Sequence, residues 1–542
     1  MINQYKKELT KSSVYLIIFT TITSMFISAT EFIGPLLIRN FVDNYNLDKF
    51  NISTLIWILV TFICCYIFKV FLNRMKNNYS VVFKTKESKK LIGLMFKMKY
   101  LELNKLEPTY LIEKITYTID TLFSLYAETI AAFIIAIITI IGCIIFMIFV
   151  EPMVAVMFII IIPIQIFGYK KLNKKLSDIC VKLQTINAKS FTNIISIASA
   201  VDYIKQSSDP KHINDMLGKF LKTIYGENAK VNKFAGVVSI TLSDIISILS
   251  NGIYIYVTIL LITSKLTLSD FIFTSLINSI FFPALNRIVG ANINLRDLKG
   301  VYSFVEEELL SNLEIDGTKI LEKIENIDFD IKSIGYNDNE LISDVDMKIF
   351  PGDVVMIKGE SGCGKSTLVK GLIKFLDLEN IKINGNNIRE YKNSALRNKI
   401  SFFSQNVPIV TGTIKENILL GAEKDDNLLD KIKDKEFMKK FYEYPDGLET
   451  KIFENGSNLS GGDKQKIAIA RIFIEDPDVV ILDEITSSID RETAEVILGD
   501  IVNSYKDKMI FIISHDANVE KYASKVYEIK DKKWNMIINN EV

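Results

Sequence analysis

One short run in the second half of the chain has residue types and spacing that suit the binding of phosphate groups. The glycine, lysine and serine spacing in residues 359–366 is that of a P-loop. Glycines let backbone N–H groups turn toward phosphate oxygens, Lys365 can reach the β- and γ-phosphates, and the Ser366 hydroxyl can ligate Mg²⁺. The residues predicted to bind a nucleoside triphosphate here are Gly359, Glu360, Ser361, Gly362, Cys363, Gly364, Lys365, Ser366 and Thr367.

Two acidic residues and a histidine further along the chain could supply the chemistry of hydrolysis. The apolar run 478–482 ends in Asp483 and Glu484. This arrangement suits Asp483 holding Mg²⁺ through water and Glu484 polarising the attacking water. A third apolar run, 509–514, ends at His515, which is one of only two histidines in the chain.

These residues need a parallel sheet to bring them together. The run 353–358 is short, apolar and β-branched, and the residues after the P-loop, 367–374, have a helical pattern. Strand, loop and helix is the order in which a P-loop occurs. Parallel α/β sheets place ligand contacts at the carboxyl ends of their strands, so we expect the P-loop, the carboxylates and His515 to meet at one edge.

Length and composition divide the chain. A chain of 542 residues is too long for one hydrophobic core. Residues 1–300 contain long apolar runs, whereas 301–542 have the interspersed charge of a soluble α/β domain. The 64 basic and 64 acidic residues balance, so nucleic acid is not an expected partner. The five cysteines have neither metal-ligand nor disulfide spacing.

The first half reads as a multi-pass membrane domain. Most of its apolar stretches reach the ~20 residues that cross a bilayer. Basic residues outnumber acidic ones by ten to five in segment 73–126 and by twelve to five in segment 170–234. We therefore expect these segments and both termini in the cytoplasm. The six predicted spans are 14–38, 55–72, 127–150, 154–169, 235–262 and 271–289.

The two long cytoplasmic segments keep apolar residues at helical spacing, so the membrane helices are expected to continue out of the bilayer. A turn or a transverse helix is expected at the breaks Glu107-Pro108 and 207–210. Two acidic residues, Glu31 and Asp244, fall inside predicted spans, where charge is costly. Each is interpreted either as functional or as a member of an internal ion pair.

A glycine-containing turn opens an amphipathic helix at residues 458–471, and with it the chain resembles an exporter-type half-transporter of the ATP-binding cassette (ABC) family. Leu459 to Gly462 resembles the ABC signature. The other positions that match family motifs are Gln405 (Q-loop), Asp490 (D-loop), His515 (switch histidine) and Tyr336 (the aromatic residue that stacks on adenine).

The resemblance implies a membrane all-α domain of six helices (1–305), a linker (306–325) and an α/β P-loop cassette (326–542). It implies that two cassettes pack head to tail, with ATP between the P-loop of one and Ser460, Gly461 and Gly462 of the other. Gln405 would contact Mg²⁺ beside Ser366 and Asp483, and Asp490 would lie at the nucleotide. The two cytoplasmic breaks would be coupling helices.

The expected function is ATP-driven export of a hydrophobic or amphipathic peptide, lipid or drug, in a bacterial plasma membrane and with a second half-transporter as partner. One departure from the family pattern is Asp463, which stands where the signature usually has Gln. We expect its charge near the partner's γ-phosphate to slow ATP use. A homodimer, a weakly hydrolysing half of a heterodimer, and a siderophore importer with an exporter fold remain open.

Overall fold

The computed structural model describes residues 2–44, 52–206, 211–336, 339–404, 406–421, 426–484 and 491–539. Within these ranges several side chains are not described, the longest stretches being 4–13, 166–182 and 289–297. The chain divides into two compact units, Met1–Leu313 and Glu314–Val542.

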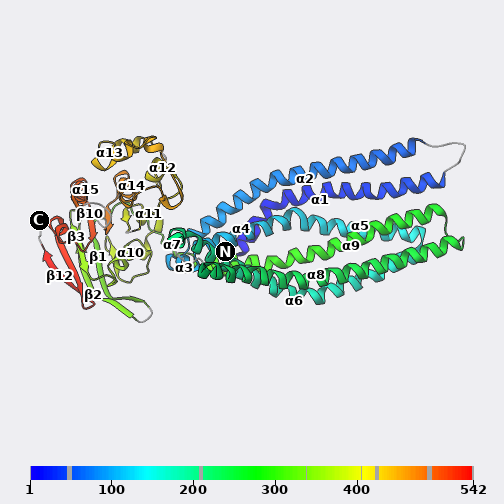
Figure 1. Ribbon diagram of the computed structural model, residues 1–542, viewed down its shortest axis with the longest axis horizontal. Coiled ribbons are helices and arrows are strands. Elements are labelled where there is room, and N and C mark those ends of the chain that lie inside the picture. Colours follow the sequence, from blue (N-terminus) through cyan, green and yellow to red (C-terminus); the bar gives the residue numbers. More distant parts are fainter. Residues whose placement is uncertain are drawn as a thin grey trace. The chain divides into compact units, whose positions relative to one another are not determined.

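The first unit is helical throughout its described residues, and its long helices run alongside one another (Figure 1). The α-helices are α1 (Ile2–Asp43), α2 (Ile52–Met95), α3 (Tyr100–Leu106), α4 (Pro108–Ser124), α5 (Ile130–Val150), α6 (Pro152–Ser199), α7 (Val201–Gln206), α8 (Lys211–Ile262) and α9 (Leu268–Ser303). A π-helical turn, η1 (Leu125–Thr129), joins α4 to α5, and η2 (Phe304–Leu309) and η3 (Leu310–Asn312) follow α9.

Length and hydropathy qualify five described helical stretches to cross a membrane. They contain the predicted spans in α1, α2 and α5 and overlap those in α8 and α9, where the described stretches are Ser243–Ile262 and Leu268–Ile288. A sixth apolar stretch, Pro152–Gln165 at the start of α6, is shorter, and the rest of that predicted span has undescribed side chains. Large apolar residues such as Trp57 and Phe149 are exposed on this unit, as expected of side chains that face lipid.

The membrane helices continue well beyond their apolar parts, as the sequence predicts. α2 and α6 are unbroken over 44 and 48 residues. After each, a short helix precedes the next long one, α3 in the first case and α7 in the second. The first break falls at Glu107, whose φ of 63° ends α3 and directs the chain into α4 at Pro108. The predicted break at 207–210 lies outside the described residues.

Aromatic side chains pack the middle of this unit. The rings of Phe158 on α6 and Phe281 on α9 stack with centroids 3.8 Å apart, and Phe282 meets Phe158 edge to face. Near the start of α9, Arg39 of α1 forms an ion pair of 2.6 Å with Asp270. These contacts join helices that are distant in sequence.

The second unit is a mixed α/β domain. Its strands are β1 (Ile327–Tyr336), β2 (Asn339–Ile349), β3 (Val354–Gly359), β4 (Ile381–Ile383), β5 (Asn386–Asn387), β6 (Ile400–Phe403), β7 (Gly412–Thr413), β8 (Lys451–Ile452), β9 (Val479–Asp483), β10 (Met509–Ile513), β11 (Lys525–Lys530) and β12 (Lys533–Asn539). Its α-helices are α10 (Lys365–Leu372), α11 (Asn393–Arg397), α12 (Ile414–Ile418), α13 (Glu436–Tyr442), α14 (Gly461–Ile474) and α15 (Arg491–Ser504). Short 3₁₀ turns are η4 (Ile388–Glu390), η5 (Asp426–Lys431), η6 (Gly447–Glu449), η7 (Glu454–Gly456) and η8 (Ala517–Tyr522).

The main sheet has the strand order β5-β4-β1-β2-β12-β11-β3-β10-β9-β6. The strands β11, β3, β10, β9 and β6 pair in parallel, whereas β1, β2, β4 and β5 pair antiparallel. Successive residues of β3 alternate between two buried cores, with Met356 in the core that contains α14 and Ile357 in the core that contains α10. Because both faces of this strand are covered, its first four residues, Val354 to Ile357, are all apolar.

Candidate functional site

The P-loop connects the carboxyl end of β3 to the amino end of α10, as its spacing predicts. Glycine is required at two of its positions. A Cβ at Gly359 would lie 2.8 Å from Sγ of Cys363, and Gly364, with φ of 106°, precedes the first residue of α10 in the left-handed region. The two glycines therefore allow the backbone of the loop to approach a bound phosphate group closely.

Lys365 lies buried at the centre of the site. Its Nζ donates hydrogen bonds of 2.8 Å to the carbonyl oxygens of both Gly359 and Glu360, and lies 4.0 Å from Sγ of Cys363. The Nε2 atom of His515 lies 3.2 Å from the same Nζ. Since an ammonium group only donates, this nitrogen of His515 accepts. Lys365 and His515, 150 residues apart, thus meet where β3 and β10 end.

The two acidic residues follow β9, which pairs with β10. Asp483 is buried and accepts a hydrogen bond from the side chain of Ser366. Burial raises the pKa of Asp483, and the negative charge of Glu484 acts in the same direction, against the hydrogen bond from Ser366. A hydroxyl and a carboxylate joined in this way are the oxygen ligands that Mg²⁺ prefers, so these residues fit a Mg²⁺ ion.

Glu484 has an unusual backbone conformation for a residue with a side chain. Its φ is 54°, and its N–H donates to the carbonyl oxygen of Ile513 at 3.0 Å. A non-glycine residue held in this region costs about 1–3 kcal/mol, and such residues cluster at active sites. Oε1 of Glu484 lies 3.8 Å from Nε2 of His515. The carboxylate of Glu484 thus lies beside the histidine, at the same edge of the sheet as Lys365.

A cleft of about 660 Å³ opens over the P-loop. Besides the loop and His515, its lining includes residues that the motif analysis missed. They come from β2, from the end of β3 and from the β11–β12 hairpin, whose turn at Asp531 and Lys532 has two residues of positive φ. No local pattern marks them, because only long-range strand pairing brings the hairpin beside β3. The missed lining residues are Glu340, Leu341, Lys358, Glu528, Ile529, Lys530, Asp531 and Lys532.

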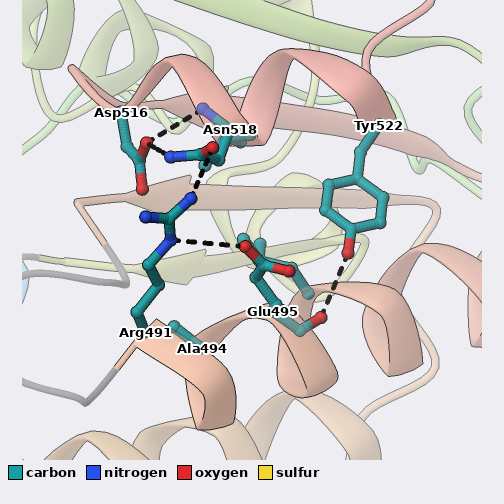
Figure 2. Close-up of a pocket in the computed structure, with 8 residues that line it drawn as sticks. Arg491, Ala494, Glu495, Asp516, Asn518 and Tyr522 are labelled. Carbon is teal, nitrogen blue, oxygen red and sulfur yellow. Dashed lines mark hydrogen bonds and ion pairs between the residues drawn. The ribbon is translucent and has the colours of Figure 1, made fainter.

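The segment after His515 is tied to the start of α15 (Figure 2). Arg491, the first residue of α15, donates to Oδ1 of Asn518 at 2.7 Å and lies 3.5 Å from the carboxylate of Glu495. The hydroxyl of Tyr522 donates to the carbonyl oxygen of Glu495 at 3.2 Å. These contacts surround a small cavity of about 150 Å³ and join the helix after the predicted D-loop to the turn η8, which follows His515.

The signature residues form a second, separate feature. Ser460 caps the amino end of α14, and Gly461 and Gly462 are its first two residues. None of these three lines the cleft over the P-loop. The free N–H groups and the positive dipole end of α14 allow the signature to bind an anion. This anion-binding position is separate from the cleft over the P-loop of the same cassette.

Asp463, at the start of α14, is paired within its own cassette. Its carboxylate is 2% exposed and completes a capping box with Ser460. Nζ of Lys440 on α13 lies 2.6 Å from Oδ1, and the hydroxyl of Tyr444 donates to Oδ2 at 3.2 Å. Burial acts to raise the pKa of Asp463, but hydrogen bonds from Lys440 and Ser460 outweigh it and hold the pKa below its usual range. The charge is therefore compensated within the cassette.

The side-chain positions of three predicted site residues are not described. Tyr336 is the last residue of β1, but its side chain is not described. Gln405 and Asp490 lie outside the described residues. Of the charged residues in the predicted spans, Glu31 lies 3.5 Å from Nζ of Lys69, so an ion pair is present there, whereas Asp244 is exposed on α8.

Comparisons with known proteins agree with both units. A family model described as ABC transporter matches residues 342–487, and one described as ABC transporter transmembrane region matches residues 17–285. A solved structure described as a bacterial Atm1-family ABC exporter with ATP bound has a TM-score of 0.83 at 17% identity, covering 98% of this chain and 95% of that one. This likeness concerns the fold.

Relatives from Staphylococcus aureus match a smaller part of this chain than the solved structure does. Those of strains NCTC 8325 / PS 47 and bovine RF122 / ET3-1 are 34% and 33% identical over 237 residues, which is 43% of this chain. Their names assign them, provisionally, to multidrug export as ATP-binding/permease proteins. The match spans 41% of the length of these relatives.

A P-loop nucleotide-binding domain that follows a helical membrane domain in one chain defines the class: a membrane protein with its own nucleotide site. Both family models describe parts of an ABC transporter, so the predicted resemblance is confirmed. The chain belongs to the ABC transporter family, with membrane region and cassette fused.

Proposed function

We propose that this chain is one half of an ATP-driven exporter. The observation that supports this most strongly is the meeting of Lys365, Asp483, Glu484 and His515 at one sheet edge, in a chain that also carries the membrane unit. These are the groups that phosphoryl transfer requires, because its catalysis is mostly positioning and electrostatic stabilisation.

Each residue has a role that its geometry permits. Lys365 would exchange its two loop carbonyl partners for phosphate oxygens, and the backbone N–H groups of the loop would hold the rest of the triphosphate. Ser366 and Asp483 would hold Mg²⁺, which neutralises phosphate charge when bound. Glu484 would take the proton of the attacking water, with His515 orienting the reacting groups.

Three further roles rest on the resemblance. Tyr336 would stack on adenine, and Gln405 would contact Mg²⁺ and the attacking water. Asp490 would lie at the nucleotide between two cassettes.

A second copy would complete each site. The signature lies outside the cleft of its own cassette, so a nucleotide on the P-loop needs the signature of another cassette to cover it. We favour a homodimer. The alternative, a weakly hydrolysing half of a heterodimer, was based on the charge of Asp463. The ion pair with Lys440 compensates that charge.

The transported molecule is proposed to be a hydrophobic or amphipathic drug, lipid or peptide, in line with the names of the relatives and the exposed apolar surface of the membrane unit. We propose that both termini lie in the cytoplasm of a bacterial plasma membrane, and the lysine-rich segments support this orientation. A siderophore importer with the same fold would differ in transport direction.

ATP hydrolysis by the purified chain in lipid nanodiscs tests the proposal. We expect Mg²⁺-dependent turnover that falls ~10²-fold or more in Glu484→Gln, the scale for loss of a positioned base. The control is Glu322→Gln, which makes the same chemical change at an exposed residue before β1 and should keep wild-type turnover. Equal turnover in wild type and Glu484→Gln would contradict the proposal.

A further inference from the structure

Two adjoining cavities lie within the membrane unit. One, of about 370 Å³, is bounded by α1, α2 and α9, and the other, of about 270 Å³, by α1, α2, α9 and the start of α5 with its preceding π turn. Three charged residues, Glu31, Lys69 and Arg287, line both cavities. The larger volume falls in the range of roughly 300–1,000 Å³ that small-molecule sites occupy.

The charges on the walls do not cancel. Glu31 is paired with Lys69 at 3.5 Å, and Glu128, in the second cavity, is paired with Lys76 at 2.5 Å. Arg287 has no ion-pair partner among the residues that the structure describes. The combined lining therefore carries one positive charge in excess, and Arg287 is the residue that supplies it.

The rest of the larger cavity is suited to an apolar body. Phe62, Ile38, Leu276 and Ile280 line it, along with the hydroxyls of Thr30, Thr61 and Ser279. A lone charge inside a membrane span is costly and is expected to face a partner or a pathway. A guanidinium group presents a fork of N–H donors that matches carboxylate and phosphate oxygens.

We propose that the two cavities form a binding site for an amphipathic anion, with a carboxylate or phosphate on Arg287 and an apolar chain between α1, α2 and α9. This names the substrate class of the proposed exporter and rests on that function. Two sources share this chemistry, a transported amphipathic acid and an anionic membrane lipid. In either case the anion would neutralise the excess charge and accept hydrogen bonds from the guanidinium group of Arg287.

The test is binding of 11-(dansylamino)undecanoic acid and of its uncharged methyl ester to the full chain in phosphatidylcholine nanodiscs, followed by dansyl fluorescence. We expect the acid to bind more tightly than the ester. Arg287→Gln should weaken binding of the acid about tenfold, the scale of a charge-assisted hydrogen bond, and leave the ester unchanged. Arg287→Lys should recover part of the loss. The matched control is Lys265→Gln, which removes a charge from the exposed turn between α8 and α9, outside both cavities, and should change neither affinity.

Nanodiscs that contain phosphatidylglycerol distinguish the two sources. Competition by this lipid for the acid, lost in Arg287→Gln, identifies a lipid as occupant, and absence of competition identifies the transported acid. Equal affinity for acid and ester, or an Arg287→Gln variant that binds the acid as wild type does, would overturn the proposal. ATP hydrolysis by the same preparation is measured separately, so failure of this site in a hydrolysing protein is distinct from failure of the proposed exporter.

Discussion

The pair formed by Asp463 and Lys440 should control both the stability of the cassette and its ATP hydrolysis. Lys440→Gln leaves a nearly buried carboxylate with only the neutral donors Ser460 and Tyr444. A hydrogen bond to a charged group contributes about 1.5–3 kcal/mol, and the lower end applies because the Lys440 side chain is 45% exposed. Asp463→Gln should cost less, about 1 kcal/mol, since Gln can keep the capping box and the freed lysine can be hydrated.

The effect on hydrolysis separates the two variants. With its charge compensated, Asp463 should matter little, so Asp463→Gln should change turnover less than about threefold. Lys440→Gln exposes an uncompensated charge at the amino end of the signature helix. At an effective dielectric constant of ~20, repulsion between this carboxylate and a bound phosphate should weaken the interaction by about 1–2 kcal/mol. Turnover of Lys440→Gln should therefore fall roughly 5- to 30-fold.

The double variant is the decisive comparison. Lys440→Gln with Asp463→Gln removes both charges, so turnover should return to within about threefold of wild type and the two unfolding costs should not add. The assays are phosphate release at saturating ATP and urea unfolding followed by the fluorescence of Trp534 on β12. A large rise in turnover on Asp463→Gln alone, or no rescue in the double variant, would refute this reasoning.

Three other outcomes follow from individual residues of the cassette. Cys363 lies 4.0 Å from Nζ of Lys365, so saturating ATP should slow its maleimide labelling at least tenfold, and unchanged labelling would place the thiol outside the occupied site. Because the native pKa of Asp483 is raised, its contribution to stability is greatest below its unfolded pKa and is lost as pH rises through the native value. Asp483→Asn should therefore raise the unfolding temperature of the nucleotide-free protein at pH 7 while abolishing stabilisation by Mg²⁺ATP, whereas a fall in that temperature would contradict the assignment. The pKa of Asp463 is lowered, so its contribution is fully present above its unfolded pKa and is lost as pH falls through the native value; Asp463→Gln should flatten this acid limb of the stability curve, and an unchanged limb would show that Asp463 does not produce it.

Much of the fold could be predicted because its strongest signals are local. The P-loop, the strand before it and the helix after it are contiguous, so spacing alone predicts their order. The runs that became β3, β9 and β10 are apolar up to their carboxyl ends because both faces of these strands are buried. The membrane spans follow from hydropathy for the same local reason, and the fourth predicted span, 154–169, is short because Glu151 lies before it and Lys170 and Lys171 follow it.

The features that escaped prediction depend on contacts between distant residues. Lys440 precedes Asp463 by 23 positions and reaches it only because α13 packs beside the start of α14. The β11–β12 hairpin reaches the cleft through pairing of β11 with β3, which no motif encodes. The ion pair between Glu31 and Lys69 joins two helices, so sequence alone could state it only as one of two alternatives.

The most direct test of ATP-driven transport asks whether nucleotide binding changes the membrane unit. Cys65 lines the larger membrane cavity, and a variant in which it is the sole cysteine reports on access to that cavity. In this variant with Glu484→Gln, Mg²⁺ATP should change the rate of labelling of Cys65 by a polar maleimide at least fivefold, as a shift between two conformations of about 1 kcal/mol would. Adding Lys365→Ala, which removes the phosphate-binding ammonium group, should abolish the change. A labelling rate that Mg²⁺ATP leaves unaltered, in protein shown to bind ATP, would contradict the proposed coupling.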